Sequence, residues 1–217
     1  MDRKSSEAAV AEKLLQVSAV KLQPEHPFTW ASGWKSPIYC DNRQVLSFPF
    51  VRDFIKSELC SVVFESFPEA NALAGVATAG IAWGAMVADQ LKLPFAYVRP
   101  KPKEHGLSNQ IEGKIGMGDK VIVVEDLVST GMSSLKAVEA IKSAGAEVAG
   151  MVSIFTYGFP QAETAFANAG VKLISLTNYD RLLEVGLQKE IFQPDQFSFL
   201  LNWKQDPGGW TKLQESN

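Results

Sequence analysis

The chain has 217 residues, enough for one domain with a small appended lobe. Its apolar share of 46% and charged share of 21% are typical of a soluble globular protein, and a net charge of −3 argues against a broad basic surface for nucleic acid. Cys40 and Cys60 have the spacing of neither a disulfide framework nor a metal pair. The sequence shows no signal peptide and no apolar run of the about 18 residues that span a membrane, so we expect a cytoplasmic protein.

Apolar spacing divides most of the chain into alternating helices and strands. Helices are predicted at 8–22, 50–65, 81–91, 134–144 and 161–169, and strands at 72–77, 95–98, 121–124, 147–155 and 171–175. Residues 28–42 are expected to be irregular or to form a hairpin, and residues 179–217 to combine a short helix with an irregular, Trp-rich tail. Because alternating strands and helices imply right-handed crossovers, the predicted fold class is α/β, with a parallel β-sheet flanked by helices.

The most informative stretch runs from Val121 to Ser134. Its first four residues are branched and apolar, which favours a strand buried on both faces. Glu125 and Asp126 follow where we expect that strand to end, and a Ser-Thr-Gly turn at 129–131 precedes a helix. A strand, a tight turn and a helix N-terminus form an anion site, because unpaired N–H groups and the helix dipole converge there. Two acids beside such a site indicate a ligand that also presents hydroxyls, as ribose 5-phosphate does.

Each candidate segment also has a purely structural interpretation. The acids are compatible with an ordinary strand whose end is solvated, and the hydroxyls at 129 and 130 with a simple helix cap. The small-residue turn at 77–80 has two equally weighted interpretations. It either binds a second anion such as pyrophosphate or is an ordinary strand-to-helix connection. Residues 99–118 are predicted to form a long mobile loop, with a short hairpin as a possible part of it. The loop has several Lys or Arg side chains, which would stabilise a diphosphate leaving group, and glycines, which would let it close over a site. The alternative interpretation is that this loop is a solvated basic segment without a functional role.

Four segments in this order resemble the orotate phosphoribosyltransferases, a family of type I phosphoribosyltransferases. Residues 28–43 are similar to the family's N-terminal hood segment, and residues 75–81 to its pyrophosphate loop. Residues 99–106 are similar to the catalytic loop, and residues 125–133 to the motif that binds phosphoribosyl pyrophosphate (PRPP). The resemblance implies a single domain over 1–217, with a hood at about 1–45, a possible C-terminal contribution to it, and a core at about 46–180.

The resemblance also implies an activity in pyrimidine biosynthesis. Enzymes of this family join orotate to PRPP and release orotidine 5′-monophosphate (OMP) and pyrophosphate, through an oxocarbenium-like state at ribose C1. Mg²⁺ would arrive bound to PRPP, and the sequence suggests no protein-built metal site. The implied assembly is a homodimer in which the loop of one subunit reaches into the site of its partner. Nucleic acid and membranes are not expected as partners.

Site residues follow from the resemblance position by position. Catalytic roles fall on Lys103, His105 and Asp126. The residues implied to bind PRPP are Thr78, Ala79, Gly80, Arg99, Lys103, His105, Glu125, Asp126, Leu127, Val128, Ser129, Thr130, Gly131, Met132 and Ser133. Orotate would be contacted by Ser129, Lys35 and Tyr39.

The chain departs from the family pattern at a few charged positions. Some members carry Lys where this chain has Ala31, Ala79 and Pro100, and Arg where it has Tyr157. Anion recognition would then rest more on Lys35, Lys101 and backbone donors. Two other functions stay open from the sequence: a phosphoribosyltransferase for another base, and a PRPP-sensing regulatory module without catalysis.

Overall fold

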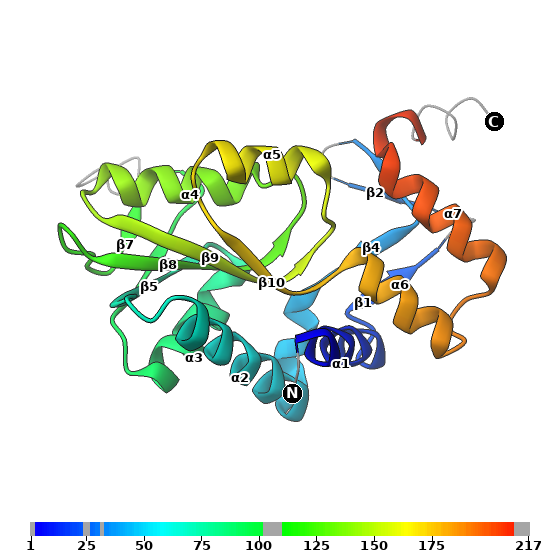
Figure 1. The fold of residues 1–217 in the computed structure, drawn as a ribbon, viewed down its shortest axis with the longest axis horizontal. Coiled ribbons are helices and arrows are strands. Elements are labelled where there is room, and N and C mark those ends of the chain that lie inside the picture. Colours follow the sequence, from blue (N-terminus) through cyan, green and yellow to red (C-terminus); the bar gives the residue numbers. More distant parts are fainter. Residues whose placement is uncertain (1–2, 24–26, 31–32, 102–109, 211–217) are drawn as a thin grey trace. The chain divides into compact units, whose positions relative to one another are not determined.

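The computed structural model describes residues 3–23, 27–30, 33–101 and 110–210 (Figure 1). Two compact units make up the chain: residues 50–176 form one, and residues 1–49 together with 177–217 form the other. We call them the core unit and the terminal unit. No helix in the described residues is long and apolar enough to cross a membrane.

The core unit is built on a six-stranded sheet with the order β10-β9-β8-β5-β6-β7. The strands are β5 (Ala72–Val76), β6 (Phe95–Val98), β7 (Ile111–Glu112), β8 (Lys120–Val128), β9 (Glu147–Thr156) and β10 (Leu173–Asn178). The neighbours β6, β5, β8 and β9 pair in parallel, whereas the short edge strand β7 runs antiparallel to β6. All of β5 is buried, and so are Val121 to Val124 of β8, as expected for strands covered on both faces.

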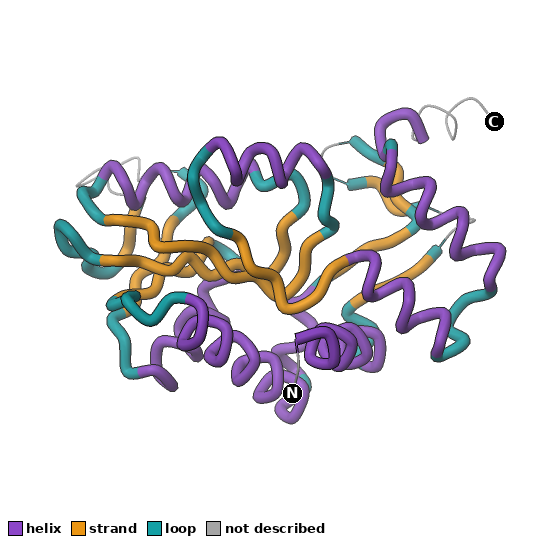
Figure 2. The backbone as a smooth tube through the Cα atoms, viewed as in Figure 1, coloured by secondary structure: helices purple, strands orange, loops and turns teal. Residues whose placement is uncertain are grey.

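Four helices cover this sheet: α2 (Pro49–Ser66), α3 (Ala79–Leu91), α4 (Met132–Ser143) and α5 (Pro160–Asn168). Figure 1 shows α4 and α5 over one face and α2 and α3 over the other, and Figure 2 shows the strands as one layer between them. This arrangement confirms the predicted α/β class with a mostly parallel sheet.

Glycines let α3 lie directly on the sheet. A Cβ atom added to Gly80 would come within 2.4 Å of the carbonyl oxygen of Val124, and one added to Gly75 within 2.6 Å of the carbonyl oxygen of Gly80. Any side chain at either position would therefore push the backbones apart. The N-terminus of α3 is held in this way against the carboxyl end of β5 and beside β8.

The terminal unit contains three helices, a 3₁₀ turn and two small antiparallel sheets in its described residues. Its elements are α1 (Arg3–Gln16), β1 (Val20–Leu22), β2 (Phe28–Thr29), β3 (Lys35–Ser36), β4 (Ile38–Cys40), the 3₁₀ turn η1 (Asn42–Ser47), α6 (Tyr179–Gln188) and α7 (Pro194–Gln205). The pairs β1–β4 and β2–β3 make up the two sheets. The second pair is the hairpin that the composition of residues 28–42 predicted as one of two possibilities.

Residues from the two ends of the chain pack together in the terminal unit. The indole Nε1 of Trp203, a fully buried residue of α7, donates to the carbonyl oxygen of Lys35 at 3.0 Å. The same indole lies 5.6 Å, centroid to centroid, from the rings of both Trp30 and Tyr179. An ion pair of 2.8 Å joins Lys189 to Glu12. The C-terminal helices are thus part of the same packed unit as the N-terminal hairpin.

The sequence-based boundaries were wrong in two places near the chain ends. The helix predicted at 8–22 ends at Gln16, because Ser18 adopts a left-handed backbone conformation (φ 54°) and residues 20–22 pair with β4 instead. The tail predicted to be irregular contains α7, whose first turn has Pro194 and a reciprocal cap between Gln193 and Gln196.

Two strands of the core unit also differ from the prediction. β8 does not end before the acids: it continues through Glu125 and Asp126 to Val128, because β9 keeps pairing with it beyond the point where β5 stops. The last strand of the sheet begins at Leu173 and ends at Asn178, whereas the apolar pattern placed it at 171–175.

Candidate active site

A cavity of about 410 Å³ lies at the carboxyl ends of β5 and β6, next to the first two turns of α4. Ligands of open parallel sheets bind at this edge. The lining residues are Val76, Ala77, Val98, Arg99, Pro100, Lys101, Gln110, Thr130, Met132, Ser133, Lys136 and Ala137. The charged residues in this lining are all basic. It is therefore suited to an anion, even though the whole chain has a net charge of −3.

Two helix N-termini at this edge have no side-chain cap. The N-cap of α4 is Gly131, which takes the left-handed conformation (φ 80°) and carries no side chain to bond the first turn. The N-cap of α3 is Thr78, whose hydroxyl makes no capping hydrogen bond. No side chain therefore competes with a ligand for the backbone N–H groups of either first turn, although the Ile81 N–H donates to the Thr78 carbonyl oxygen at 3.3 Å, and the helix dipoles favour a negative ligand.

Arg99 is held in place where β6 ends. Its backbone N–H donates to the carbonyl oxygen of Gln110 at 2.8 Å, and the Gln110 amide Nε2 donates back to the carbonyl oxygen of Arg99 at 2.8 Å. The Arg99 guanidinium lies 3.6 Å from the Glu112 carboxylate on β7. These contacts fix both ends of the segment that follows Arg99. Lys103 and His105, the catalytic residues predicted in that segment, lie outside the described residues.

The two acids of the motif occupy different environments. Glu125 is only 5% exposed; its Oε1 accepts from the backbone N–H of Asp126 at 3.0 Å, and its Oε2 accepts from the Ser134 hydroxyl at 3.2 Å. Burial, and then the charge of the neighbouring Asp126, raise the pKa of Glu125 well above its ordinary value. Asp126 is half-buried. The half-buried acid is therefore better placed than its neighbour to meet a substrate.

The structure brings part of the predicted site together in the core unit. Arg99, Thr130, Met132 and Ser133 line the cavity. Thr78, Ala79 and Gly80 form the start of α3, and Leu127 and Val128 are the last residues of β8. Of these, Val128 has a fully buried side chain, so only its backbone is available to a ligand. Ser129 is half-buried in the turn between β8 and α4.

The two predicted orotate contacts outside the motif belong to the terminal unit. Lys35 lies on β3, where its ammonium donates to the Thr29 hydroxyl across the hairpin at 2.9 Å. Tyr39 lies on β4 with 36% of its surface exposed, and its ring centroid is 5.5 Å from that of Phe28. An exposed, partly supported ring of this kind offers a stacking surface.

Sequence reasoning missed two polar residues of the cavity, Gln110 and Lys136. Gln110 gave no signal, because its role depends on the pairing of β7 with β6. Lys136 follows Ser133 by three residues and Met132 by four, the spacing that places helical residues on one face. That spacing was the signal available. Tyr157, noted as a departure from the family, is 1% exposed and stacks on Phe159 at 5.4 Å.

The fold and this site define a class of protein. A family profile described as "Phosphoribosyl transferase domain" matches residues 58–179, which include most of the core unit and its cavity. Glu125 and Asp126 do not line the cavity, but they precede the turn at 129–131, whose Thr130 does. A basic cavity, two helix N-termini without a side-chain cap and an acid pair on the same strand ends suit a phosphorylated sugar with free hydroxyls. The class is therefore that of the phosphoribosyltransferases.

Individual relatives narrow this class. The chain is 56% identical to the orotate phosphoribosyltransferase of Bacteroides thetaiotaomicron, over 95% of this chain and 98% of the relative. It is 53% identical to the orotate phosphoribosyltransferase of Listeria monocytogenes serotype 4b, over 96% of this chain and all of the relative. Among solved structures, orotate phosphoribosyltransferase from Aeropyrum pernix is similar with a TM-score of 0.73 and 33% identity, covering 81% of this chain and 96% of that one. The chain belongs to the orotate phosphoribosyltransferase family, which confirms the resemblance predicted from its sequence segments.

Proposed function

We propose that this enzyme transfers the 5-phosphoribosyl group of PRPP to orotate, giving OMP and pyrophosphate. The observation that carries the proposal is the basic cavity with two uncapped helix N-termini at the carboxyl edge of the sheet, in a chain that shares 56% identity with a full-length orotate phosphoribosyltransferase. PRPP has phosphate groups at both ends of a ribose, so it needs two anion sites separated by acceptors for hydroxyls. The core unit offers this combination.

Each group of residues has a distinct part in the reaction. The turn from Ser129 to Ser133 and the first N–H groups of α4 bind the 5′-phosphate, while Asp126 accepts from a ribose hydroxyl. The start of α3, with Arg99, binds the diphosphate. As the bond from C1 to the diphosphate oxygen breaks, negative charge collects on the leaving group and positive charge on the ribose ring. The orotate ring nitrogen bonds to C1 and loses its proton, which passes to water or to the departing pyrophosphate. Fixed cations near the diphosphate stabilise that charge distribution more than the ground state.

Glu125 acts mainly on the shape of the site. Its carboxyl group links Ser134, in the first turn of α4, to the backbone of Asp126 in β8. The phosphate-binding turn and the ribose-binding acid are thereby held in one arrangement before the substrate arrives. Such preorganisation lowers the cost of ordering the site on binding.

Mg²⁺ is part of the proposal as an ion that enters with PRPP. No group of three or more His, Cys, Asp or Glu side chains within the described residues is arranged to hold a metal ion by itself. Mg²⁺ in phosphate-handling sites is commonly held by one or two carboxylates and the substrate phosphates, so the half-buried Asp126 fits that role. Bound there, the ion would offset charge on the diphosphate.

The orotate contacts, the assembly and the location extend the proposal. Lys35 and Tyr39 offer a cation for the orotate carboxylate and a ring for its pyrimidine, and the buried Tyr157 is not needed for either. A homodimer with shared sites is carried over from the family resemblance. The exposed phenylalanines of α2, Phe50 (94%) and Phe64 (74%), are compatible with a subunit interface. A cytoplasmic location agrees with two cysteines that form no disulfide.

A panel of bases tests the proposed reaction. Pyrophosphate release from PRPP is measured with Mg²⁺ and, separately, with orotate, adenine, hypoxanthine, guanine or uracil. The proposal expects release with orotate and background release with the others. Release with a purine would assign the enzyme to another base, and PRPP binding without turnover of any base would indicate a regulatory module.

A further inference from the structure

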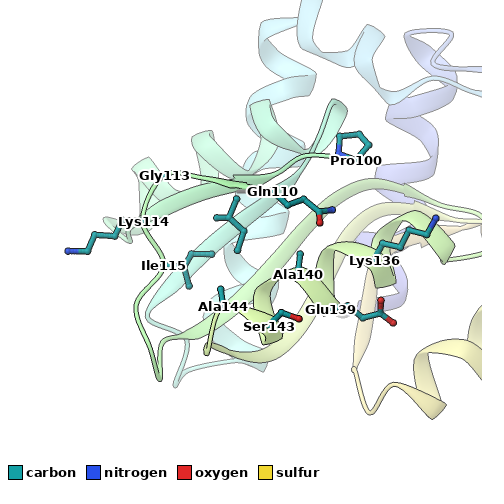
Figure 3. A pocket seen from close by; sticks show the side chains of 11 residues that line it. Pro100, Gln110, Gly113, Lys114, Ile115, Lys136, Glu139, Ala140, Ser143 and Ala144 are labelled. Atoms are coloured by element: carbon teal, nitrogen blue, oxygen red, sulfur yellow. The ribbon is translucent and has the colours of Figure 1, made fainter. Parts of the chain in front are cut away.

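Lys136 lies in the wall between two cavities of the core unit. It lines the 410 Å³ cavity of the active site, and also a neighbouring cavity of about 680 Å³ that extends along α4 (Figure 3). Pro100 and Gln110 are shared by both linings as well. Among the residues that line the active-site cavity, Lys136 is the cation that α4 contributes, and it lies close to the predicted phosphate turn in the sequence.

The Lys136 side chain extends toward the substrate end of its helix. Side chains on an α-helix lean toward the N-terminus, so a lysine on the second turn extends over the first. Figure 3 shows the Lys136 ammonium pointing away from Ser143 and Ala144, which lie at the C-terminal end of α4. The first turn is where Gly131 leaves the backbone N–H groups without a side-chain cap.

The charge of Lys136 is not used by the protein itself within the described residues. Its ammonium makes no hydrogen bond or ion pair with another described side chain, although Glu139 follows it by three residues on the same helix. The active-site lining contains Arg99 and Lys101 as further cations and no acid. Arg99 is already compensated by the Glu112 carboxylate at 3.6 Å, whereas Lys136 makes no such ion pair within the described residues and can bind a polyanion in the cavity.

We infer that Lys136 is a further phosphate-binding residue of the active site, and that its ammonium binds a phosphate group of PRPP. The inference rests on the proposed function. It adds a contact from the second turn of α4 to those of the turn at 129–133. A lysine recognises the 5′-phosphate and the diphosphate by the same chemistry. The substrates of the reverse reaction distinguish the two groups, because OMP carries only the 5′-phosphate and pyrophosphate corresponds only to the diphosphate.

The test compares Lys136→Gln with two matched variants. Lys136→Arg keeps the charge at the same position. Lys142→Gln removes a charge from the last turn of the same helix, where the Lys142 ammonium donates to the Ala169 carbonyl oxygen and lines neither cavity. For Lys136→Gln we expect the KM for PRPP to rise about tenfold, which corresponds to 1.4 kcal/mol, with the KM for orotate unchanged. Lys136→Arg should recover most of the affinity, and Lys142→Gln should keep the wild-type KM for PRPP.

Reverse kinetics then assign the phosphate. A raised KM for pyrophosphate places Lys136 on the diphosphate, and a raised KM for OMP places it on the 5′-phosphate. Wild-type enzyme without orotate-dependent turnover would count against the proposed function, not against this contact. If wild type turns over and Lys136→Gln leaves the KM values for PRPP, OMP and pyrophosphate unchanged, or if Lys136→Arg is as damaged as Lys136→Gln, the inference is wrong.

Discussion

Glu125 brings a carboxyl group into the interior of the core unit, where a charge is costly. The group keeps two hydrogen bonds there, from the Asp126 backbone and the Ser134 hydroxyl, but it also faces the charge of Asp126. Burial and that charge raise its pKa. A carboxyl whose pKa is raised on folding favours the folded state when protonated and disfavours it once the pH rises above the pKa of the unfolded chain.

The Glu125→Gln variant tests this electrostatic cost. Glutamine keeps the shape and can bond both partners, since its oxygen accepts from the Asp126 N–H and its amide donates to the Ser134 hydroxyl. We expect Glu125→Gln to unfold at a higher temperature than wild type near pH 7.5. The difference should disappear near pH 4, where Glu125 is protonated in wild type. A stability difference that does not change with pH would contradict the assigned environment.

At the scale of single residues, the sequence revealed the chemistry but not the burial. The order Glu-Asp followed by Ser-Thr-Gly identified the acids and the turn. It could not show that Glu125 is buried under Ser134, because this depends on β8 continuing alongside β9. Lys136 was missed for a related reason: a lysine on an amphipathic helix is usually solvated, and only the neighbouring strand ends show that a cavity lies beside it.

At the scale of elements, α3 depends on its close approach to the sheet. Gly80→Ala would place a methyl group 2.4 Å from the Val124 carbonyl oxygen, a backbone atom that cannot rotate away. Gly84→Ala is the matched control, since its Cβ would meet the ring edge of Phe95 at 2.6 Å, which is part of a movable side chain. Gly84, in the interior of α3, also gains the full helix propensity of alanine, whereas Gly80 lies in the first turn.

The two glycine variants are expected to differ in their loss of stability and in their effect on PRPP binding. Overpacking commonly costs about 1–3 kcal/mol, and we expect Gly80→Ala to lie at the upper end of that range and Gly84→Ala near or below the lower end. Gly80→Ala should also raise the KM for PRPP, because it shifts the start of α3. Urea unfolding and steady-state kinetics give both quantities. Equal stability losses in the two variants would contradict the proposed packing of α3.

Periodicity was a reliable guide to elements where burial is local and repetitive. It located α2, α3, β5 and β9 within about two residues, because their apolar spacing reflects one covered face or two. It failed at 17–22, where pairing with β4 overrides a helical pattern, and at the C-terminal residues, whose helices are stabilised by contacts with the opposite end of the chain. Contacts between distant parts of the sequence have no local signature.

At the scale of the whole molecule, Trp203 joins the C-terminal helices to the N-terminal hairpin. Trp203→Ala should destabilise the protein by about 3–5 kcal/mol, as for other buried large-to-small changes. Trp203→Phe keeps most of the packing and loses the hydrogen bond to the Lys35 carbonyl, for which we expect about 1 kcal/mol. Because Lys35 is a proposed orotate contact, Trp203→Phe should raise the KM for orotate more than that for PRPP. A larger increase in the KM for PRPP than in the KM for orotate would contradict a role of the hairpin in orotate binding.

A shared site makes a prediction about mixtures of variants. If Lys103 acts in the partner's site, Lys103→Ala and Asp126→Asn should complement each other after subunit exchange, because each heterodimer has one site with an intact loop and an intact acid. Activity should then exceed the mean of the two parent enzymes. Co-purification of one untagged variant with the other, affinity-tagged variant verifies that the subunits exchange. Activity no higher than that mean would show that the loop serves its own subunit.

The central claim, that the acid at the carboxyl edge of β8 holds the ribose of PRPP during transfer to orotate, is tested most directly by the kinetics of Asp126→Asn. Orotate-dependent pyrophosphate release is measured for this variant, for wild type and for Asp89→Asn, which removes an exposed charge on α3. Loss of a charged acceptor should lower kcat/KM by about 10- to 150-fold, equivalent to about 1.5–3 kcal/mol, with the unfolding transition unchanged. Asp89→Asn should match wild type. A value of kcat/KM for Asp126→Asn within twofold of wild type would contradict the claim.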